Sequence, residues 1–212
     1  EVASTAAFLG SVAQYPHLAG LQPDLYRCFV EQSWRHNGAH GTVGLIHLES
    51  LFTDEKAGLL RSASYPRLRR HWHFVNELQL FEIEHHKQYG ITIHGAPQEN
   101  VKFTQASWLY HPDTVSRSMD HDGSGQEPGL KDLDGKWDLR PHRSRITSVT
   151  DETLATWHAV LESAAVPVRR SRMVYAVNRS TAAVLDKLSR SRRFSSLGLE
   201  FCDGWHEKND RT

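Results

Sequence analysis

The sequence predicts an α/β fold, in which short apolar strands alternate with amphipathic helices over the first hundred residues. Apolar residues recur at helical spacing in residues 24–37, and a strand-sized apolar run at residues 42–48 follows a glycine. Helices placed between strands favour a mainly parallel sheet. The chain has 212 residues, of which 39% are hydrophobic and 24% charged, so it is long and apolar enough to bury a core.

Four elements follow in order within the first eighty residues. Residues 24–37 form a helix that begins after a proline and ends at an Asn-Gly pair. Residues 42–48 form a buried strand. Residues 54–70 repeat leucines at helical spacing, although Pro66 must end this helix early. Residues 72–81 alternate between two sets of side chains, which is typical of a strand.

The next part of the chain predicts a hairpin followed by an irregular extension. Residues 89–95 form another short strand, joined to the preceding one by the polar loop at residues 82–87. This short connection favours an antiparallel hairpin at one edge of the sheet. After Pro97 the alternation is lost and turn residues dominate, until residues 150–165 and 178–190 again show helical patterns.

Composition excludes several classes of protein. No apolar run approaches the roughly 18 residues of a membrane helix, and the first residues lack the pattern of a signal peptide. Cys28 and Cys202 lie far apart, which excludes a disulfide scaffold and a zinc site built from cysteines. The 14 histidines show no metal-binding spacing, so we expect scattered surface histidines and no metal site. The low cysteine content indicates a reducing, cytoplasmic location.

Charge is balanced overall but unevenly distributed. The 25 basic residues equal the 25 acidic ones. Residues 167–194 contain eight basic residues and one acidic residue, whereas residues 113–138 contain seven acidic and three basic residues. The basic segment indicates either a surface that faces a polyanion or an ordinary solvated helix face.

Several short motifs occur in a familiar order. They are DLYRCF at 24–29, GTVGLI at 41–46, LLR at 59–61, LF at 80–81 and YGITI at 89–93. This set resembles the second half of the catalytic domain of gamma-class N6-adenine DNA methyltransferases, which occur in restriction–modification and phage-defence systems. Four later motifs resemble the connector of the large defence-associated members: LYHP at 109–112, PGLK at 128–131, WDLRPH at 137–142 and WHEKND at 205–210.

The resemblance implies the latter half of a Rossmann-like methyltransferase sheet. Residues 1–98 would belong to the methyltransferase domain, residues 99–165 to a connector, and residues 166–212 to the start of a DNA-facing target-recognition region. The glycine-rich loop and the Asn-Pro-Pro motif of the family do not occur in this sequence. The chain is therefore expected to be a fragment, inactive alone, that needs the missing N-terminal half or other defence-system subunits.

The implied reaction moves a methyl group from S-adenosylmethionine to adenine N6 in double-stranded DNA. Phe81 matches the aromatic residue that stacks on the extruded adenine, a contact that supplies ~1–3 kcal/mol. The alternative is a strand-terminal residue that closes the core. Phe29, with Tyr26 on the same helix, matches the wall beside the adenine of the cofactor. The alternative for Phe29 is an ordinary core aromatic.

The basic segment matches the region of the family where contacts to DNA are expected. Phosphate contacts by arginine release counterions, so the binding they support is sensitive to salt. The candidates for these contacts are Arg169, Arg170, Arg172 and Arg193.

Two other functions remain open. The first is a non-catalytic DNA-binding or scaffold piece that needs a partner chain. The second is a Mg²⁺-dependent nuclease, in which Asp113 and Asp134 would hold the metal and Lys136 would position a water. The nuclease requires both carboxylates on adjacent strands of one sheet.

Overall fold

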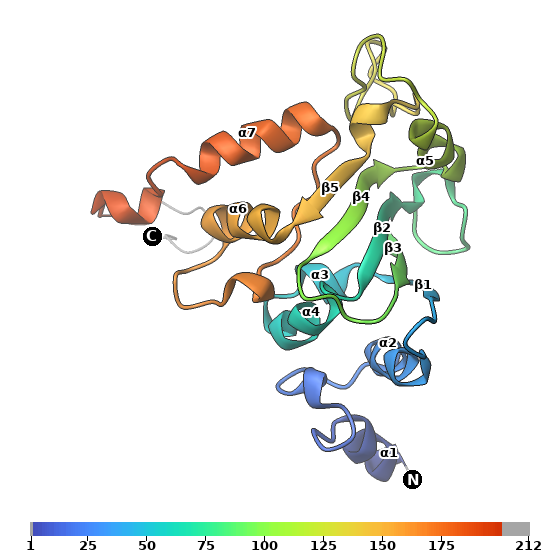
Figure 1. Ribbon diagram of the computed structural model, residues 1–212, viewed down its shortest axis with the longest axis vertical. Helices are drawn as coiled ribbons and strands as arrows, with labels where there is room; N and C mark the ends of the chain where they lie inside the picture. The colour runs from blue at the N-terminus through green and yellow to red at the C-terminus, as the bar shows by residue number, and fades with distance from the viewer. Residues whose placement is uncertain (1, 201–212) are drawn as a thin grey trace, which may run out of the picture.

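The computed structural model describes residues 2–200, and it confirms the α/β class (Figure 1). Cys202 and the motif at residues 205–210 lie outside the described residues. One sheet of five strands runs through the molecule in the order β1-β3-β2-β4-β5. The strands are β1 (Val43–Leu48), β2 (Leu68–Val75), β3 (Gln88–His94), β4 (Lys102–Leu109) and β5 (Thr147–Thr150).

The sheet is mixed, and three of its four pairings are antiparallel. The expectation of a mainly parallel sheet is wrong, because β3 returns from β2 and inserts between β2 and β1. The antiparallel hairpin of β2 and β3 is confirmed, but its expected place at one edge of the sheet is wrong, because β1 and β4 extend the sheet on both sides of it. Strands β1, β2 and β4 run in the same direction, so their carboxyl ends meet at one edge of the sheet.

Strands β4 and β5 carry the sheet past residue 98, where the sequence pattern was lost. The inward side chains of β4 include the polar residues Gln105 and Ser107, which are both buried. The Gln105 amide donates to the carbonyl oxygen of Val174 at 3.3 Å. A strand whose buried face carries amides and hydroxyls lacks the apolar alternation by which strands are recognised.

The described part of the chain also contains seven α-helices. Asp24 caps α2 by accepting from the Tyr26 amide, and Thr150 forms a capping box on α6. Within residues 54–70 the helix α4 ends at Ser64, just before Pro66 as predicted, and residues from Leu68 onward belong to β2. The helices are α1 (Val2–Leu9), α2 (Leu25–His36), α3 (Ser50–Thr53), α4 (Gly58–Ser64), α5 (Pro112–Met119), α6 (Asp151–Leu161) and α7 (Arg179–Ser189).

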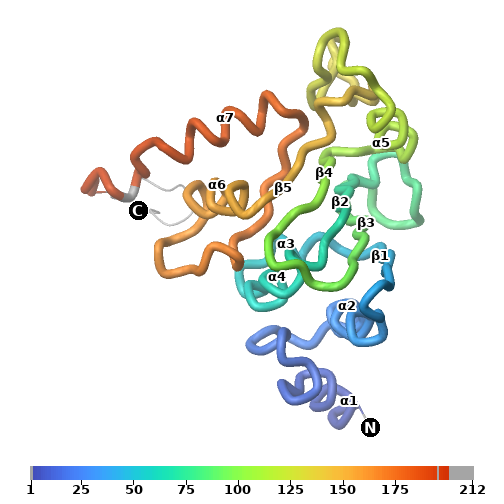
Figure 2. The backbone as a smooth tube through the Cα atoms, in the orientation of Figure 1, coloured from blue at the N-terminus to red at the C-terminus, as the bar shows by residue number. Residues whose placement is uncertain are grey.

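A segment without regular structure, residues 171–178, joins the late part of the chain to the early strands. We call it the strap, and Figure 2 shows it running from beside α4 along the sheet to the start of α7. Tyr65 donates to the carbonyl of Ser171 at 2.8 Å, and Trp108 donates to the carbonyl of Tyr175 at 2.9 Å. Met173 belongs to the main hydrophobic core. The strap therefore packs, together with α4 and α6, on one face of the sheet.

Two apolar clusters pack against the two faces of the sheet. The larger one gathers residues of α2, α3, α4, α6 and the strap, including Phe52, Tyr65 and Leu154. The smaller one joins Trp72 and Phe74 of β2 to residues of β3, β4 and α5. Among the described helices, none combines the length and the apolar character that a membrane span requires.

Candidate functional site

The carboxyl edge of the sheet is where the candidate site lies. In open α/β sheets, ligands bind outside the carboxyl ends of the strands. Strand β2 ends there at Val75 and continues into a 3-10 turn, Asn76–Leu78, and then into a loop that leads back to β3 at Gln88. Phe81 sits in this loop, because the strand expected over residues 72–81 stops six residues earlier.

Asn76 fixes the conformation of this loop. Its side chain is fully buried, and its amide nitrogen donates to the carbonyl oxygens of Phe81 at 3.0 Å and Ile83 at 2.9 Å. Its side-chain oxygen accepts from the Phe81 amide at 3.1 Å. One buried amide therefore satisfies backbone groups five and seven residues away, as a buried polar group must do to offset its desolvation.

The Phe81 ring stands at the surface, with 42% of the residue exposed. Its edge rests on Tyr89, with ring centroids 5.0 Å apart at an interplanar angle of 89°. Tyr89 in turn stacks parallel to Phe74 at 5.4 Å. The ring is thus supported from below by core aromatics, and it does not close the core as the alternative interpretation required.

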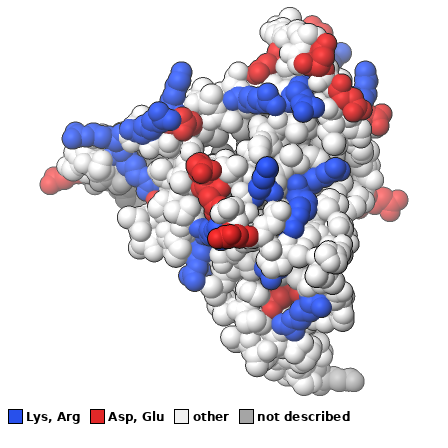
Figure 3. All heavy atoms as spheres, in the orientation of Figure 1, with Lys and Arg blue, Asp and Glu red and all other residues white. Residues whose placement is uncertain are grey.

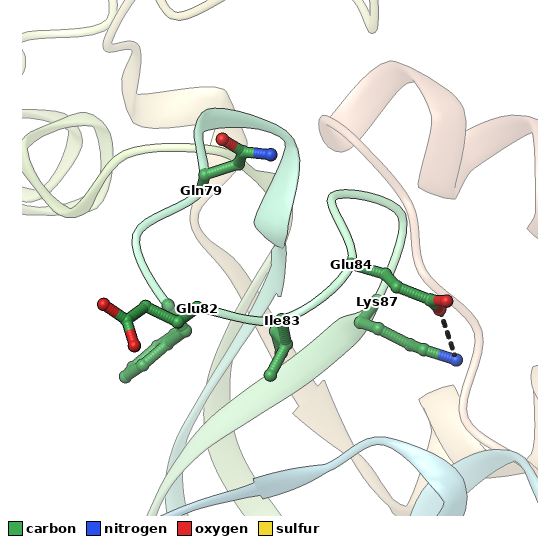
Figure 4. A pocket seen from close by; sticks show the side chains of 6 residues that line it. Gln79, Glu82, Ile83, Glu84 and Lys87 are labelled. Atoms are coloured by element: carbon green, nitrogen blue, oxygen red, sulfur yellow. Dashed lines mark ion pairs between the residues drawn. The ribbon is translucent and has the colours of Figure 1, made fainter.

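A shallow hollow of about 630 Å³ opens beside this ring (Figure 4). Glu84 and Lys87 form an ion pair at 3.0 Å on one side of it, and Glu82 stands on the other. The hydrogen bond from Lys87 lowers the pKa of Glu84, so this carboxyl stays ionised. The lining residues are Gln79, Phe81, Glu82, Ile83, Glu84 and Lys87.

The charges of this hollow restrict what it can accept. Lys87 offsets the charge of Glu84, and Glu82 adds one negative charge at the rim, so an uncharged ring can lie on Phe81 without meeting like charge. A carboxylate also accepts hydrogen bonds from an amine. The hollow is suited to an uncharged, flat group that carries amine donors.

Tyr26 and Phe29 lie on α2 in different surroundings. The Tyr26 ring stacks on His47 of β1, and its hydroxyl lies 2.6 Å from the Ser50 hydroxyl. Phe29 is 62% exposed, so the interpretation of this residue as an ordinary core aromatic is wrong. The Tyr26 ring is therefore packed within the protein, whereas the Phe29 ring is largely open to solvent.

A buried polar cluster lies under the strap, and sequence reasoning missed it. Glu49 lies 3.1 Å from His71 and accepts a hydrogen bond from the Tyr175 hydroxyl, while His73 stacks on the Tyr175 ring at 4.2 Å. Burial would raise the pKa of Glu49, but the charge and hydrogen bond of His71 lower it to about 2. Burial lowers the pKa of His73 to about 4.

The expectation of scattered surface histidines is therefore wrong. The buried histidines are His47, His71, His73, His94 and His142. Local sequence gives little sign of this burial, because the rings of His47, His71 and His94 have partners 22–45 residues away. Within residues 2–200, no three histidine, cysteine or acidic side chains are arranged to hold a metal ion.

Three of the four candidate arginines form ion pairs or hydrogen bonds with other residues of this chain. Arg169 bonds Asp151 at 3.0 Å, and Arg172 bonds Glu162 at 2.9 Å. Arg193 donates to carbonyls at the end of α6. Arg170 is exposed over Gly58. Basic groups in Figure 3 gather along α7 and over the sheet, with acidic groups between them.

The residues proposed for a nuclease do not meet the requirement for adjacent strands. Asp113 lies in the first turn of α5, and Asp134 lies in a tight turn between Asp132 and Gly135. Lys136 follows in the same turn, where its amide bonds Asp132. The nuclease hypothesis is therefore wrong for this arrangement.

Comparison with known proteins gives coarse likenesses only. No family model and no curated protein matches the sequence. The M protein of the type I restriction enzyme EcoKI is similar with a TM-score of 0.42 and 12% identity, covering 85% of this chain and 46% of that chain. The type IIG restriction endonuclease BpuSI is similar with a TM-score of 0.41 and 11% identity, covering 71% and 17%. The chain thus spans less than half of each protein, and both likenesses concern the fold alone.

Proposed function

We propose that this chain supplies the base-capturing part of an adenine-N6 DNA methyltransferase that uses S-adenosylmethionine, in a restriction–modification or phage-defence system of the cytoplasm. The observation that carries the proposal is the exposed Phe81 ring, held on a fixed loop beside an open hollow at the carboxyl edge of the sheet. The ordered motifs described above support the same family.

The physical task of such a site is to hold a base that has left the duplex. Extrusion costs a few kcal/mol of stacking and pairing, and an aromatic face returns ~1–3 kcal/mol of it. Phe81 offers such a face. Glu82, at the rim, suits the exocyclic amine of a base and disfavours its phosphate.

The cofactor site requires a further segment. S-adenosylmethionine would supply the methyl group, but Tyr26 and Phe29 alone do not form walls around its adenine, so we assign no step to them. Within the described residues β1 pairs only with β3, and its outer residues Ile46 and Leu48 are exposed. An open apolar strand edge supports the proposal that the missing N-terminal half adds to the sheet there.

Double-stranded DNA is the proposed partner. In this proposal residues 166–212 begin the DNA-facing region, and Arg170, which is exposed, is the foremost candidate for a phosphate contact. Arg169, Arg172 and Arg193 would meet phosphate only in addition to their internal partners. A second candidate function, an inert DNA-binding scaffold, uses the same basic residues but gives Phe81 no role.

The test uses the chain as it stands, with a short duplex that carries one bulged 2-aminopurine as the probe. Phe81→Ala should weaken binding of this duplex about tenfold, because the stacking contact is lost. Phe8→Ala is the matched control, since Phe8 is also half exposed and also rests edge-on against a tyrosine, Tyr15. Equal affinities of the Phe81 and Phe8 variants would favour the scaffold and end the proposal.

A further inference from the structure

Asn76 stands out because all the hydrogen-bonding capacity of its side chain serves one loop. Its oxygen accepts from the Phe81 amide, and its nitrogen donates to the carbonyls of Phe81 and Ile83. A carboxylate cannot donate and a hydroxyl carries only one proton, so no other polar side chain of this length or shorter reproduces this set of bonds. Asn76 has no exposed surface, and it touches the solvent-facing hollow only through the loop.

The same loop holds a strained residue. Gln79 adopts φ +50° and ψ +46°, a left-handed conformation that is unfavourable for a residue with a Cβ atom. Its amide donates to the carbonyl of Asn76 at 2.8 Å, and its side chain lines the hollow. A strained backbone conformation persists only where the surrounding contacts hold the residue in it. The bonds of Asn76 supply those contacts.

Phe81 is consequently fixed on two sides. Below the ring lie Tyr89 and Phe74, and behind its backbone lies the Asn76 amide. A group that is already held in its binding conformation loses little conformational freedom when its ligand arrives, so it binds more tightly.

We propose that Asn76 is a positioning residue for base capture: it holds the loop so that Phe81 is presented to an extrahelical purine before the purine arrives. This inference rests on the proposed function of Phe81, and it adds how that function is prepared. The ligand class is a neutral purine that carries an amine, extruded from duplex DNA. Asn76 does not touch it.

The test is a double-variant cycle on the whole chain with the bulged 2-aminopurine duplex as the probe. Asn76→Ala should raise Kd about fivefold to tenfold, and Asn76→Ala combined with Phe81→Ala should bind no worse than Phe81→Ala alone. The Phe81 amide should exchange with deuterium at least ten times faster in Asn76→Ala. Additive losses of affinity, or an amide whose exchange is unchanged, would overturn the proposal.

The outcomes separate this inference from the function on which it rests. If Phe81→Ala leaves Kd unchanged, the proposed function fails. If Phe81→Ala weakens binding and Asn76→Ala does not, only the positioning role fails. Should Asn76→Ala not fold, Asn76→Ser replaces it, because a hydroxyl keeps a polar group at the buried position but cannot make all three bonds of the amide. Asn76→Ser should raise Kd, and an unchanged Kd overturns the proposal.

Discussion

A single methyl group added at Gly90 should destabilise the protein severely. Gly90 lies in β3 opposite His47 and His73, directly above the buried Glu49 carboxylate. A Cβ atom at this position would lie 2.0 Å from Glu49 Oε1 and 3.3 Å from His71 Nε2. Gly90→Ala must therefore displace the carboxylate from His71 and Tyr175.

The size of the effect follows from these contacts. Overpacking a well-packed interior costs about 1–3 kcal/mol. Separating a buried charge from its partner costs about 3–5 kcal/mol when the charge stays buried. The Glu49 carboxylate can relax partly, so we expect a loss of about 3 kcal/mol in the free energy of unfolding. For a chain of this size the unfolding temperature should fall by about 10 °C.

Gly44→Ala provides the matched control, because Gly44 also lies in a strand of the same sheet. Its added Cβ would meet Ile93 Cδ1 at 3.4 Å, an ordinary contact, and alanine restricts the unfolded chain. Its stability should change by less than about 1 kcal/mol. Urea unfolding of both variants measures the difference, and a Gly90 variant as stable as the Gly44 variant would refute the reasoning.

Two further predictions concern acid and salt. Burial lowers the pKa of His73 to about 4 and that of His94 to about 3, so the unfolded chain takes up protons below about pH 6.5 that the folded chain does not. Stability should fall as the pH drops from 6.5 toward 3, and His73→Gln should flatten this fall in unfolding curves recorded at pH 7, 5 and 4. Replacing Arg169, Arg170 and Arg172 together by alanine should weaken DNA binding and reduce the slope of log Kd against log salt by about 2–3. An unchanged salt slope would show that these arginines do not contact DNA. The stability of the variant must also be measured, because Arg169 and Arg172 form ion pairs with carboxylates.

Local signals in the sequence predicted part of the fold well. Helix α2 begins and ends where its flanking Asp24 and Asn37 indicate, and the hairpin of β2 and β3 follows from two apolar runs joined by a short polar loop. The exposed position of Phe81 agrees with its place beside that loop. In each case the deciding interactions lie within about twenty residues.

The features that could not be predicted depend on distant partners. Gln105 and Ser107 are polar on the buried side of β4, and Gln105 finds its partner 69 residues later in the strap. Glu49 and Tyr175 are 126 residues apart. An asparagine after a strand is typical of any turn, so the sequence does not predict that the Asn76 amide reaches the carbonyls of Phe81 and Ile83.

The strap also determines when this protein can finish folding during synthesis. Strands β1, β2 and β3 leave the ribosome long before Tyr175, whose hydroxyl bonds the Glu49 carboxylate at the end of β1. Until then Glu49 and the face above His71 and His73 remain open to water. A chain truncated after residue 165 should therefore be cleaved readily by proteases, whereas a chain truncated after residue 178, which contains the whole strap, should resist them.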